Sequence, residues 1–374
     1  MEVRTNLAEL RVQRGIGAAQ LATQIGISRQ TIYAIEAGAY VPNTAVSLKL
    51  ARALDTTVEE LFQIDAEQST QEEVVEAKVI AEADGLEPGQ LLRMCSVGKT
   101  MVAVPPEANG WGLPLADAVL LDPVRKGKGH GDARVRVLNE RWKNVPRLLI
   151  AGCDPSVSIL AQWLQAEGCE LIVKHVNSSR AQELLQDDLI HIAGTHLVDE
   201  ATGETDILPI TRLFSRNSVV VISYAVWEEG LVTAQGNPKH IASVADLSRG
   251  EVRFTNREAG AGCRRLLDDL ISRNRIPPKR INGYDRITVG HLPAARLVRD
   301  GEVDCCISTR AVARALALDF IPLAKKPYHL ILRRLRVNEP SIQTLLQTLE
   351  KFSFRREVES CTGYDMRTSG NRLL

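Results

Sequence analysis

The hydrophobic pattern of this chain changes its period along the sequence, and that change limits the fold more than any other feature. Up to residue 64, apolar residues recur at the three- and four-residue spacing of short amphipathic helices. After Pro146, apolar runs of strand length alternate with amphipathic helical segments. The 374 residues also exceed the length of one typical domain. We therefore expect a multidomain protein, with an all-α domain at 1–65 and a two-lobed α/β domain at 146–374 that ends in a helix.

The composition is that of a folded protein with ordinary cores. Lys plus Arg (46) equals Asp plus Glu (46), and hydrophobic residues make up 44% of the chain, which excludes a disordered or collagen-like chain. No stretch approaches the ~18 apolar residues of a membrane helix, and the N-terminus lacks the apolar run of a signal peptide. We expect a cytoplasmic protein without a membrane partner.

The seven cysteines are scattered and form no Cys-x-x-Cys pair. This pattern argues against a disulfide scaffold and against a zinc motif of short spacing. We expect no metal site and no cofactor, and we expect most of the thiols to be small buried side chains.

The segment between the two domains is charged and then β-rich. Residues 65–90 contain eight acids and one base, and 68–83 lack Gly and Pro. This composition favours an acidic helical linker over 66–90. Short apolar runs then predict a small β-rich segment at 91–145, for which the sequence gives no role.

Within the first domain, the stretch from Gln20 to Glu36 has the pattern of two helices joined by a sharp turn. Gly26 suits the turn, Ser28 is a good N-cap, and Ile32 lies on the inner face of the second helix. Such a pair can place its second helix in a major groove, where Arg pairs with guanine and Gln with adenine. The residues expected to contact double-stranded DNA are Gln20, Ser28, Arg29, Gln30, Thr31, Tyr33 and Ala34.

Residues 7–62 resemble the XRE family, the Cro- and phage-repressor-like helix-turn-helix regulators. The match includes Ile35-Glu-Ala-Gly, Pro42 and Val58-Glu-Glu-Leu-Phe. The resemblance implies a homodimer that binds a near-palindromic operator with half-sites about one helical turn apart. Ala18 departs from the family, which often has a DNA-bracing Gln at this point. The alternative is a helical bundle that serves protein contact or dimerisation.

In the α/β domain, polar and glycine-rich loops follow several expected strands and open helices. Ligands of parallel sheets bind at the carboxyl ends of strands, and helix N-termini bind anions. No loop ends in the Gly-Lys-Ser of a phosphate-binding NTPase, so we do not expect ATP hydrolysis. The residues expected to bind a ligand are Asp154, Ser156, Ser158, Thr195, His196, Asn256, Arg257, Gly260, Ala261, Gly262, Cys263, Arg264, Tyr284 and Thr309.

Residues 147–335 resemble the periplasmic-binding-protein-like domain of cytoplasmic bacterial regulators and of molybdopterin-biosynthesis-related proteins. The matching motifs are Gly152-Cys-Asp-Pro, His191-Ile-Ala-Gly-Thr-His and Asn256-Arg-Glu-Ala-Gly-Ala-Gly-Cys. The resemblance implies a hinged two-lobed sensor of type II and an oxyanion ligand such as molybdate or tungstate. Ala261 and Cys263 stand where the family more often has hydroxyl residues.

These features favour a one-component transcriptional regulator, without enzymatic activity, whose operator binding a small anionic ligand modulates. Two alternatives remain. The first is a thiol-based redox regulator that uses Cys263 or the Cys305–Cys306 pair. The second is an enzyme with an attached DNA-binding head, in which Cys263 acts with His196 or His291.

Overall fold

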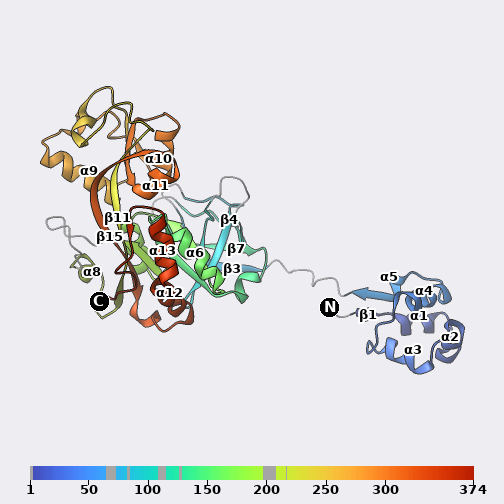
Figure 1. Cartoon of the computed structure of the whole chain (residues 1–374). Coiled ribbons are helices and arrows are strands. Elements are labelled where there is room, and N and C mark those ends of the chain that lie inside the picture. The colour runs from blue at the N-terminus through green and yellow to red at the C-terminus, as the bar shows by residue number, and fades with distance from the viewer. Residues whose placement is uncertain are drawn as a thin grey trace. The chain divides into compact units, whose positions relative to one another are not determined.

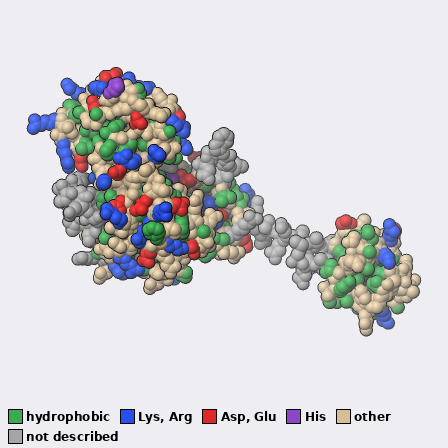
Figure 2. Space-filling model, viewed as in Figure 1, with side chains coloured by type: hydrophobic (Ala, Val, Ile, Leu, Met, Phe, Trp, Pro, Cys, Tyr) green, Lys and Arg blue, Asp and Glu red, His purple; other side chains and the backbone are tan. Residues whose placement is uncertain are grey.

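The computed structural model describes residues 3–64, 73–81, 85–107, 115–125, 129–196, 208–215 and 217–374. The chain divides into two compact units, Met1–Glu73 and Val74–Leu374 (Figure 1). None of the described helices is long and apolar enough to cross a membrane. Acidic, basic and apolar side chains are interspersed over the face of the second unit that Figure 2 shows.

The first unit is a bundle of short helices closed by a pair of strands. Leu21, Ile32 and Leu50 form its core together with other apolar residues, each with less than a tenth of its surface exposed. Its helices are α1 (Leu7–Gln13), α2 (Ala18–Ile25), α3 (Arg29–Glu36), α4 (Thr44–Ala53) and α5 (Val58–Leu61). The expectation of helices alone is wrong at the ends, because β1 (Val3–Thr5) pairs antiparallel with β2 (Phe62–Ile64).

The second unit begins with a closed five-stranded barrel in the order β3-β5-β4-β6-β7. The prediction of a helical linker at 66–90 is wrong at Val74–Ile80, which form β3, while residues 65–72 and 82–84 lie outside the described part. This segment forms a strand instead of a helix because it is rich in β-branched residues and its burial alternates, with Ala77 and Val79 pointing into the barrel. The other strands are β4 (Leu91–Val97), β5 (Thr100–Val104), β6 (Ala118–Leu120) and β7 (His130–Val137).

A nine-stranded sheet runs through the rest of the unit and forms two lobes. Its central strands β11 (Val219–Thr233) and β15 (Asp319–Arg333) are antiparallel, so the sheet is mixed instead of wholly parallel. The first lobe adds β8 (Arg147–Gly152), β9 (Glu170–His175), β10 (Ile192–Thr195), α6 (Val157–Ala166) and α7 (Ser178–Gln186). The second lobe adds β12 (Phe254–Arg257), β13 (Ile287–Thr288), β14 (Cys305–Thr309), α9 (Gly262–Arg273), α10 (His291–Arg299) and α11 (Arg310–Ala315).

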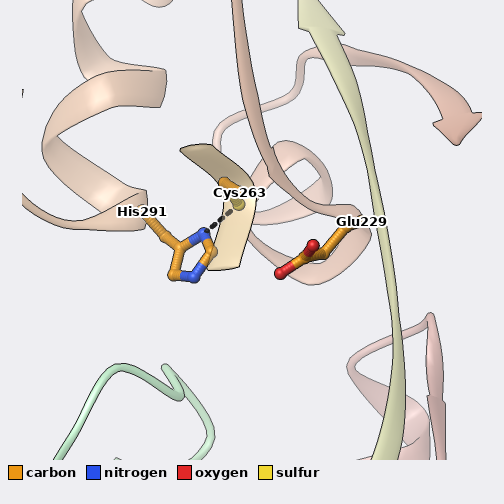
Figure 3. Close-up of side chains that lie close together, drawn as sticks. All are labelled: Glu229, Cys263 and His291. Atoms are coloured by element: carbon orange, nitrogen blue, oxygen red, sulfur yellow. Dashed lines mark hydrogen bonds between the residues drawn. The ribbon is translucent and has the colours of Figure 1, made fainter. Parts of the chain in front are cut away.

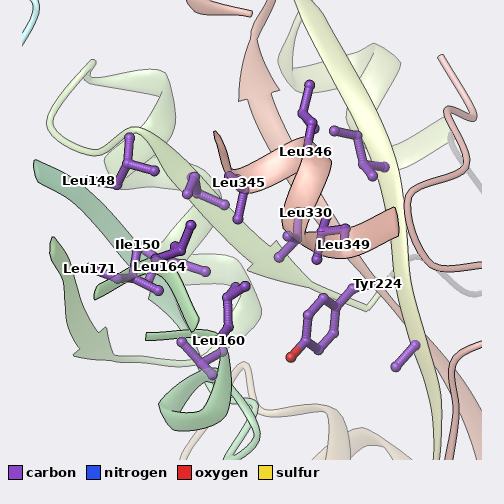
Figure 4. Close-up of a cluster of buried hydrophobic side chains, with 14 of the residues drawn as sticks. Leu148, Ile150, Leu160, Leu164, Leu171, Tyr224, Leu330, Leu345, Leu346 and Leu349 are labelled. Atoms are coloured by element: carbon purple, nitrogen blue, oxygen red, sulfur yellow. The ribbon is translucent and has the colours of Figure 1, made fainter. Parts of the chain in front are cut away.

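Both faces of the first lobe's sheet are covered. On one face, α6 and α12 (Pro340–Glu350) pack leucines against the strands (Figure 4). On the other face, barrel residues such as Val97 and Val102 pack against Leu149 and Leu184. The remaining elements of the chain are α8 (Leu208–Leu213), α12 (Pro340–Glu350), α13 (Phe352–Ser360) and β16 (Tyr364–Asp365).

A partly buried ionic cluster fixes the barrel to this lobe. Arg147 of β8 donates to Asp117 beside β6 at 2.7 Å, and Arg93 of β4 donates to Glu170 of β9 at 2.6 Å. Hydrogen bonds from both arginines hold the pKa of Asp117 below its usual value despite burial. The barrel and the first lobe therefore form one packed body.

Candidate functional site

The first candidate site is the outer face of α3 in the N-terminal unit. Gly26 adopts a left-handed conformation (φ 78°) that ends α2, and Ser28 caps α3 by accepting a hydrogen bond from the Thr31 N–H at 3.0 Å. Ile32 and Ile35 anchor the inner face of α3 in the core. The turn and the cap thus orient α3 with its polar face outward.

The predicted DNA-contacting side chains of α3 lie on this outer face. Arg29, Gln30 and Tyr33 are exposed, as are Ser28 and, on α2, Gln20, whereas Thr31 and Ala34 are half-buried. Arg29 donates to the Tyr33 hydroxyl at 2.8 Å and its guanidinium lies 5.3 Å from the ring centroid. The Arg29 fork is therefore held on the helix surface by its neighbour.

Ala18, at the family's usual glutamine position, is buried in the core with 7% of its surface exposed. The second helix accordingly presents no polar side chain at that position. Basic residues outnumber acids in 1–54, six to three, and some of them lie on the face of this unit visible in Figure 2. A net positive charge favours contact with DNA phosphates.

The second candidate site is a cleft of about 100 Å³ between the two lobes. The first lobe contributes residues of α7 and the end of β10, the second lobe contributes α9, and the central strands contribute one residue each. The lining residues are Ser178, Ser179, Gln182, His196, Glu229, Gly262, Arg265, Leu266, Asp269 and Lys326.

Two helix N-termini line this cleft from opposite lobes. On α7, Asn177 accepts from the Arg180 N–H at 2.9 Å, so helix geometry leaves the N–H groups of Ser178 and Ser179 without an intrahelical partner. On α9, the N-cap residue Ala261 makes no side-chain capping bond. Both helix ends therefore present backbone donors and the positive end of a helix dipole.

The lobes touch beside these helix ends. The Asn177 side chain donates to the Ala259 carbonyl of the second lobe at 3.1 Å. At Gly262, an added Cβ would lie 3.2 Å from His196 Cδ2, so this glycine permits the close approach of α9 to the first lobe. The cleft is narrow because backbone and side chains of both lobes meet at its edge.

The charges in the cleft come from basic and acidic residues. Arg265 is exposed and Lys326 is half-buried, and Asp269 lies one helical turn beyond Arg265. Burial raises the pKa of Glu229, which has 1% of its surface exposed, and burial lowers the pKa of His196 to about 3. His196 is therefore neutral near pH 7, and Glu229 is held closer to its neutral form than an exposed acid is.

Among the predicted ligand-binding residues, His196 and Gly262 line this cleft. Two others near the start of α6, Asp154 and Ser156, belong to a hydrogen-bonded network instead. Asp154 accepts from the Tyr364 hydroxyl at 2.7 Å and from the Ser156 N–H at 2.8 Å, and the Ser156 and Tyr224 hydroxyls are 2.9 Å apart. Ser158 is exposed and donates to Pro155 O.

The rest of the predicted ligand set is not among the residues that line the cleft. Arg257 pairs with Glu258 at 2.9 Å and is 2% exposed, and Arg264 lies over the Tyr284 ring. The remaining side chains make hydrogen bonds within the protein. Thr195 accepts from the Gln182 amide, and Asn256 donates to the Tyr284 carbonyl. The Tyr284 hydroxyl donates to Asp268, and Thr309 accepts from the Val312 N–H. Gly260 has φ +88°, Ala261 is buried, and Cys263 lies beside His291.

Sequence reasoning missed most of the residues that line the cleft, namely Ser178, Ser179, Gln182, Glu229, Arg265, Leu266, Asp269 and Lys326. For some of these residues the sequence did contain a pattern that could have indicated a site. Asn177-Ser-Ser follows a strand and opens a helix, which is the pattern used elsewhere in the chain. Glu229 is an acid inside a long apolar run. Lys326 had no such signal, because β15 itself was not predicted.

Comparison with known proteins finds a family model that matches part of each unit. A model described as the PBP superfamily domain matches residues 161–350, just over half of the chain. The chain belongs to the PBP superfamily. A helix-turn-helix model matches residues 7–61, so this PBP-superfamily protein has an XRE-type DNA-binding domain at its N-terminus.

Individual relatives agree with this division. YvgK of Bacillus subtilis (strain 168) is 28% identical over 230 residues, 61% of this chain and 74% of YvgK. An HTH-type transcriptional regulator of Archaeoglobus fulgidus is 35% identical over 66 residues, 18% of this chain and 94% of the regulator.

One solved structure is similar to part of this chain. It is a putative phosphate ABC transporter substrate-binding protein with bound phosphate from Clostridium perfringens, 11% identical, with a TM-score of 0.46, covering 57% of this chain and 97% of that one. The predicted resemblances to XRE regulators and to periplasmic-binding-protein-like domains are confirmed by the family matches. The protein is a helix-turn-helix transcriptional regulator fused to a PBP-like ligand-binding domain.

Proposed function

We propose that this regulator senses a small oxyanion in the cleft between its lobes, and that the bound anion changes the affinity of a homodimer for a near-palindromic operator. The observation that favours an anion is the pair of helix N-termini, α7 and α9, that line one cleft from opposite lobes. Helix N-termini bind anions through backbone N–H groups and the helix dipole.

The size and charge of the cleft agree with a ligand of a few heavy atoms. Its volume of about 100 Å³ is small for an organic ligand, since pockets for drug-sized molecules are about 300–1,000 Å³. Arg265 and Lys326 add positive charge, and the Ser179 and Gln182 side chains add neutral hydrogen-bonding groups. An oxyanion such as phosphate, sulfate, molybdate or tungstate meets these requirements.

The outer face of α3 supports the DNA half of the proposal. Arg29 and Gln30 are exposed side chains with forked donors that match guanine and adenine edges. A single α3 would read only half of a site, and helix-turn-helix proteins gain specificity by pairing two such helices about one DNA turn apart. This requirement is the reason for proposing a homodimer.

The redox and enzyme alternatives are less favoured by the surroundings of the thiols. Cys263, Cys305 and Cys306 are each 2% exposed or less, and burial raises the pKa of all three thiols. A buried neutral thiol is a poor nucleophile and a poor oxidation target. Cys263 does lie 3.8 Å from His291 Nδ1, but burial lowers the pKa of His291 well below its usual value. A thiolate–imidazolium pair is therefore disfavoured.

The test combines anion binding with operator binding. Phosphate, sulfate, molybdate and tungstate are screened by thermal shift, and a ligand present at ~100 times its dissociation constant stabilises by about 2.7 kcal/mol. The anion that stabilises is then added to a fluorescence-anisotropy titration with DNA from upstream of the protein's own gene. We expect the anion to change the dissociation constant for this DNA. A set of four anions that neither stabilises the protein nor alters DNA binding would refute the proposal.

A matched pair of variants locates the anion. Arg265→Gln should weaken anion binding by roughly 10-fold or more, because hydrogen bonds to charged groups contribute about 1.5–3 kcal/mol. Arg273→Gln makes the same change at the exposed far end of α9 and should leave anion affinity unchanged. Equal effects of the two variants would place the anion outside this cleft.

A further inference from the structure

Three buried side chains with metal-binding atoms meet at the floor of the interlobe cleft. Glu229, Cys263 and His291 each offer one ligand atom, and these atoms all lie within 4.8 Å of one another. Figure 3 shows the Cys263 sulfur facing His291 Nδ1, with the Glu229 carboxylate turned toward the same space. The Sγ–Nδ1 distance is 3.8 Å.

The three residues come from separate elements that fix their positions. Glu229 lies on β11, Cys263 is in the first turn of α9, and His291 is the first residue of α10. Their exposed fractions are 1%, 2% and 5%. The cluster is therefore rigidly supported, and Glu229 still reaches the cleft through which a small ion can enter.

The carboxylate of Glu229 is the unexplained group in this cluster. Neither of its oxygens makes a hydrogen bond of normal geometry with any residue of the described part of the chain. The Cys263 thiol is its neighbour, but a thiol is a weak donor. Buried carboxylates without partners are rare because they destabilise the fold unless a cation or a hydrogen bond compensates.

We propose that Glu229, Cys263 and His291 bind one divalent transition-metal ion of the zinc class at the floor of the cleft. Sulfur, imidazole nitrogen and carboxylate oxygen together are donors that zinc prefers, whereas calcium and magnesium prefer oxygen alone. Zn–S and Zn–N bonds of about 2.3 and 2.05 Å at a tetrahedral angle separate the two donor atoms by about 3.6 Å. The separation of 3.8 Å in the structure is close to this value.

The charge of the ligand set matches that of a divalent ion. With the metal bound, Cys263 is a thiolate and Glu229 a carboxylate, so the ion and its two anionic ligands sum to zero charge in a buried site. When Cys263 and Glu229 are neutral beforehand, binding releases one proton from each of them to solvent. A neutral buried complex avoids the desolvation penalty of an isolated charge.

Three protein ligands leave a tetrahedral ion with one further position. His196 lies nearby, with Nε2 3.9 Å from Glu229 Oε1. Its Nδ1 is 3.3 Å from the Pro327 carbonyl, which can only accept a hydrogen bond. In this tautomer Nδ1 holds the proton and the Nε2 lone pair faces the cluster. His196 or a small molecule in the cleft can occupy the fourth position.

The experiment uses the full chain stripped of metal with a chelator, without DNA or added anion. Equilibrium dialysis against Zn²⁺, followed by elemental analysis, should give about one tightly bound equivalent per chain. Addition of Co²⁺ should produce the near-ultraviolet sulfur-to-cobalt absorption of a thiolate ligand. Less than about 0.1 equivalent of Zn²⁺ on the wild-type chain would overturn the proposal outright.

Variants assign the ligands. Cys263→Ser should abolish the cobalt–sulfur absorption and weaken Zn²⁺ binding at least tenfold, whereas Cys361→Ser, at a half-buried cysteine near the end of α13, should change neither. An unchanged absorption in Cys263→Ser would overturn the assignment. If circular dichroism shows that Cys263→Ser does not fold, the near-isosteric variant Glu229→Gln tests the site instead. This variant should lower the affinity for Zn²⁺ at least tenfold. An unaltered affinity in folded Glu229→Gln would refute the site.

Metal binding is measured here without operator or oxyanion, so the result stands apart from the sensing proposal. A chain that binds Zn²⁺ at Cys263 but responds to no anion would keep this inference and remove the other. A chain that responds to an anion but binds no Zn²⁺ would do the reverse.

Discussion

The buried histidine His191 should make the second unit acid-sensitive in a defined pH window. His191 precedes β10, is 3% exposed, and its Nδ1 accepts a hydrogen bond from the Leu149 N–H at 3.0 Å. Only an Nδ1 without a proton can accept this bond. Burial, with a smaller contribution from the nearby Arg336 charge, lowers the pKa of His191 from 6.5 to about 4.

This shift fixes the sign and the size of the effect. The unfolded chain binds the proton near pH 6.5 and the folded chain only near pH 4, so the contribution of His191 to stability is complete above about pH 6.5 and is lost as the pH falls to about 4. At about 1.36 kcal/mol per pKa unit, the change in the pKa of His191 from 6.5 to about 4 corresponds to about 3 kcal/mol.

The perturbation that isolates this effect is His191→Asn, because the Asn amide oxygen can accept from Leu149 but does not titrate. Wild type and variant are unfolded with urea at about pH 7, 5.5 and 4 and followed by tryptophan fluorescence. All four tryptophans (Trp111, Trp142, Trp163 and Trp227) lie beyond residue 73, so the signal reports on the second unit alone. We expect the stability difference between wild type and variant to change by about 3 kcal/mol across this range, in favour of the variant at low pH.

The exposed His240 supplies the control. It has a positive φ of 46°, which Asn tolerates, so His240→Asn makes the same chemical change without altering a buried group. A difference between wild type and His191→Asn that is the same at about pH 7 and about pH 4 would refute the assignment of acid sensitivity to this histidine.

Three further predictions concern the DNA-binding face and the buried network. Arg29→Ala should weaken operator binding by about 1–3 kcal/mol and relax preference at one base pair, measured by anisotropy against operator variants; equal loss on unrelated DNA would instead indicate a phosphate contact. Ser28→Ala removes the capping bond to Thr31 and should destabilise the N-terminal unit by about 1 kcal/mol, read from its thermal melt by circular dichroism, with Ser28→Gly losing less. Burial raises the pKa of Asp154 from 3.8 to about 6, so the contribution of this residue to stability is lost as the pH rises from about 4 to 6. Asp154→Asn should become more stable relative to wild type by about 2 kcal/mol over that range in the urea assay, and a constant difference would contradict this.

The sequence predicted the parts of the fold that local patterns determine. The alternation of strand-length apolar runs with amphipathic helices after Pro146 was expected, and helices such as α6, α7 and α9 form there because each has an apolar stripe. The prediction of a helical linker was wrong because it gave more weight to the acidic composition than to the β-branched residues Val74, Val75 and Val79. The barrel buries these residues or pairs them with β7. Long-range pairing, such as β1 with β2, has no local signal at all.

The candidate cleft was less predictable than the fold. Strand-end loops were predicted to bind the ligand, and two of the predicted residues, His196 and Gly262, line the cleft. The neighbouring side chains are taken up by partners that only the folded chain supplies, as Tyr364 does for Asp154 across 210 positions of sequence. In the same way, Glu229 and His291 meet Cys263 from far along the chain. No spacing rule detects such a cluster.

The continuity of β11 and β15 through both lobes has a mechanical consequence. The two 15-residue strands pair along almost their whole length, so separating the lobes must flex a hydrogen-bonded ribbon. The ladder is interrupted between Ser223 and Ala225 and again between Glu229 and Gly230, and such irregularities are where a ribbon bends most easily. Glu229 therefore lies at a point of high compliance. A ligand that contacts it would set the curvature of the ribbon directly, and an intact ribbon would restore its resting shape when the ligand leaves.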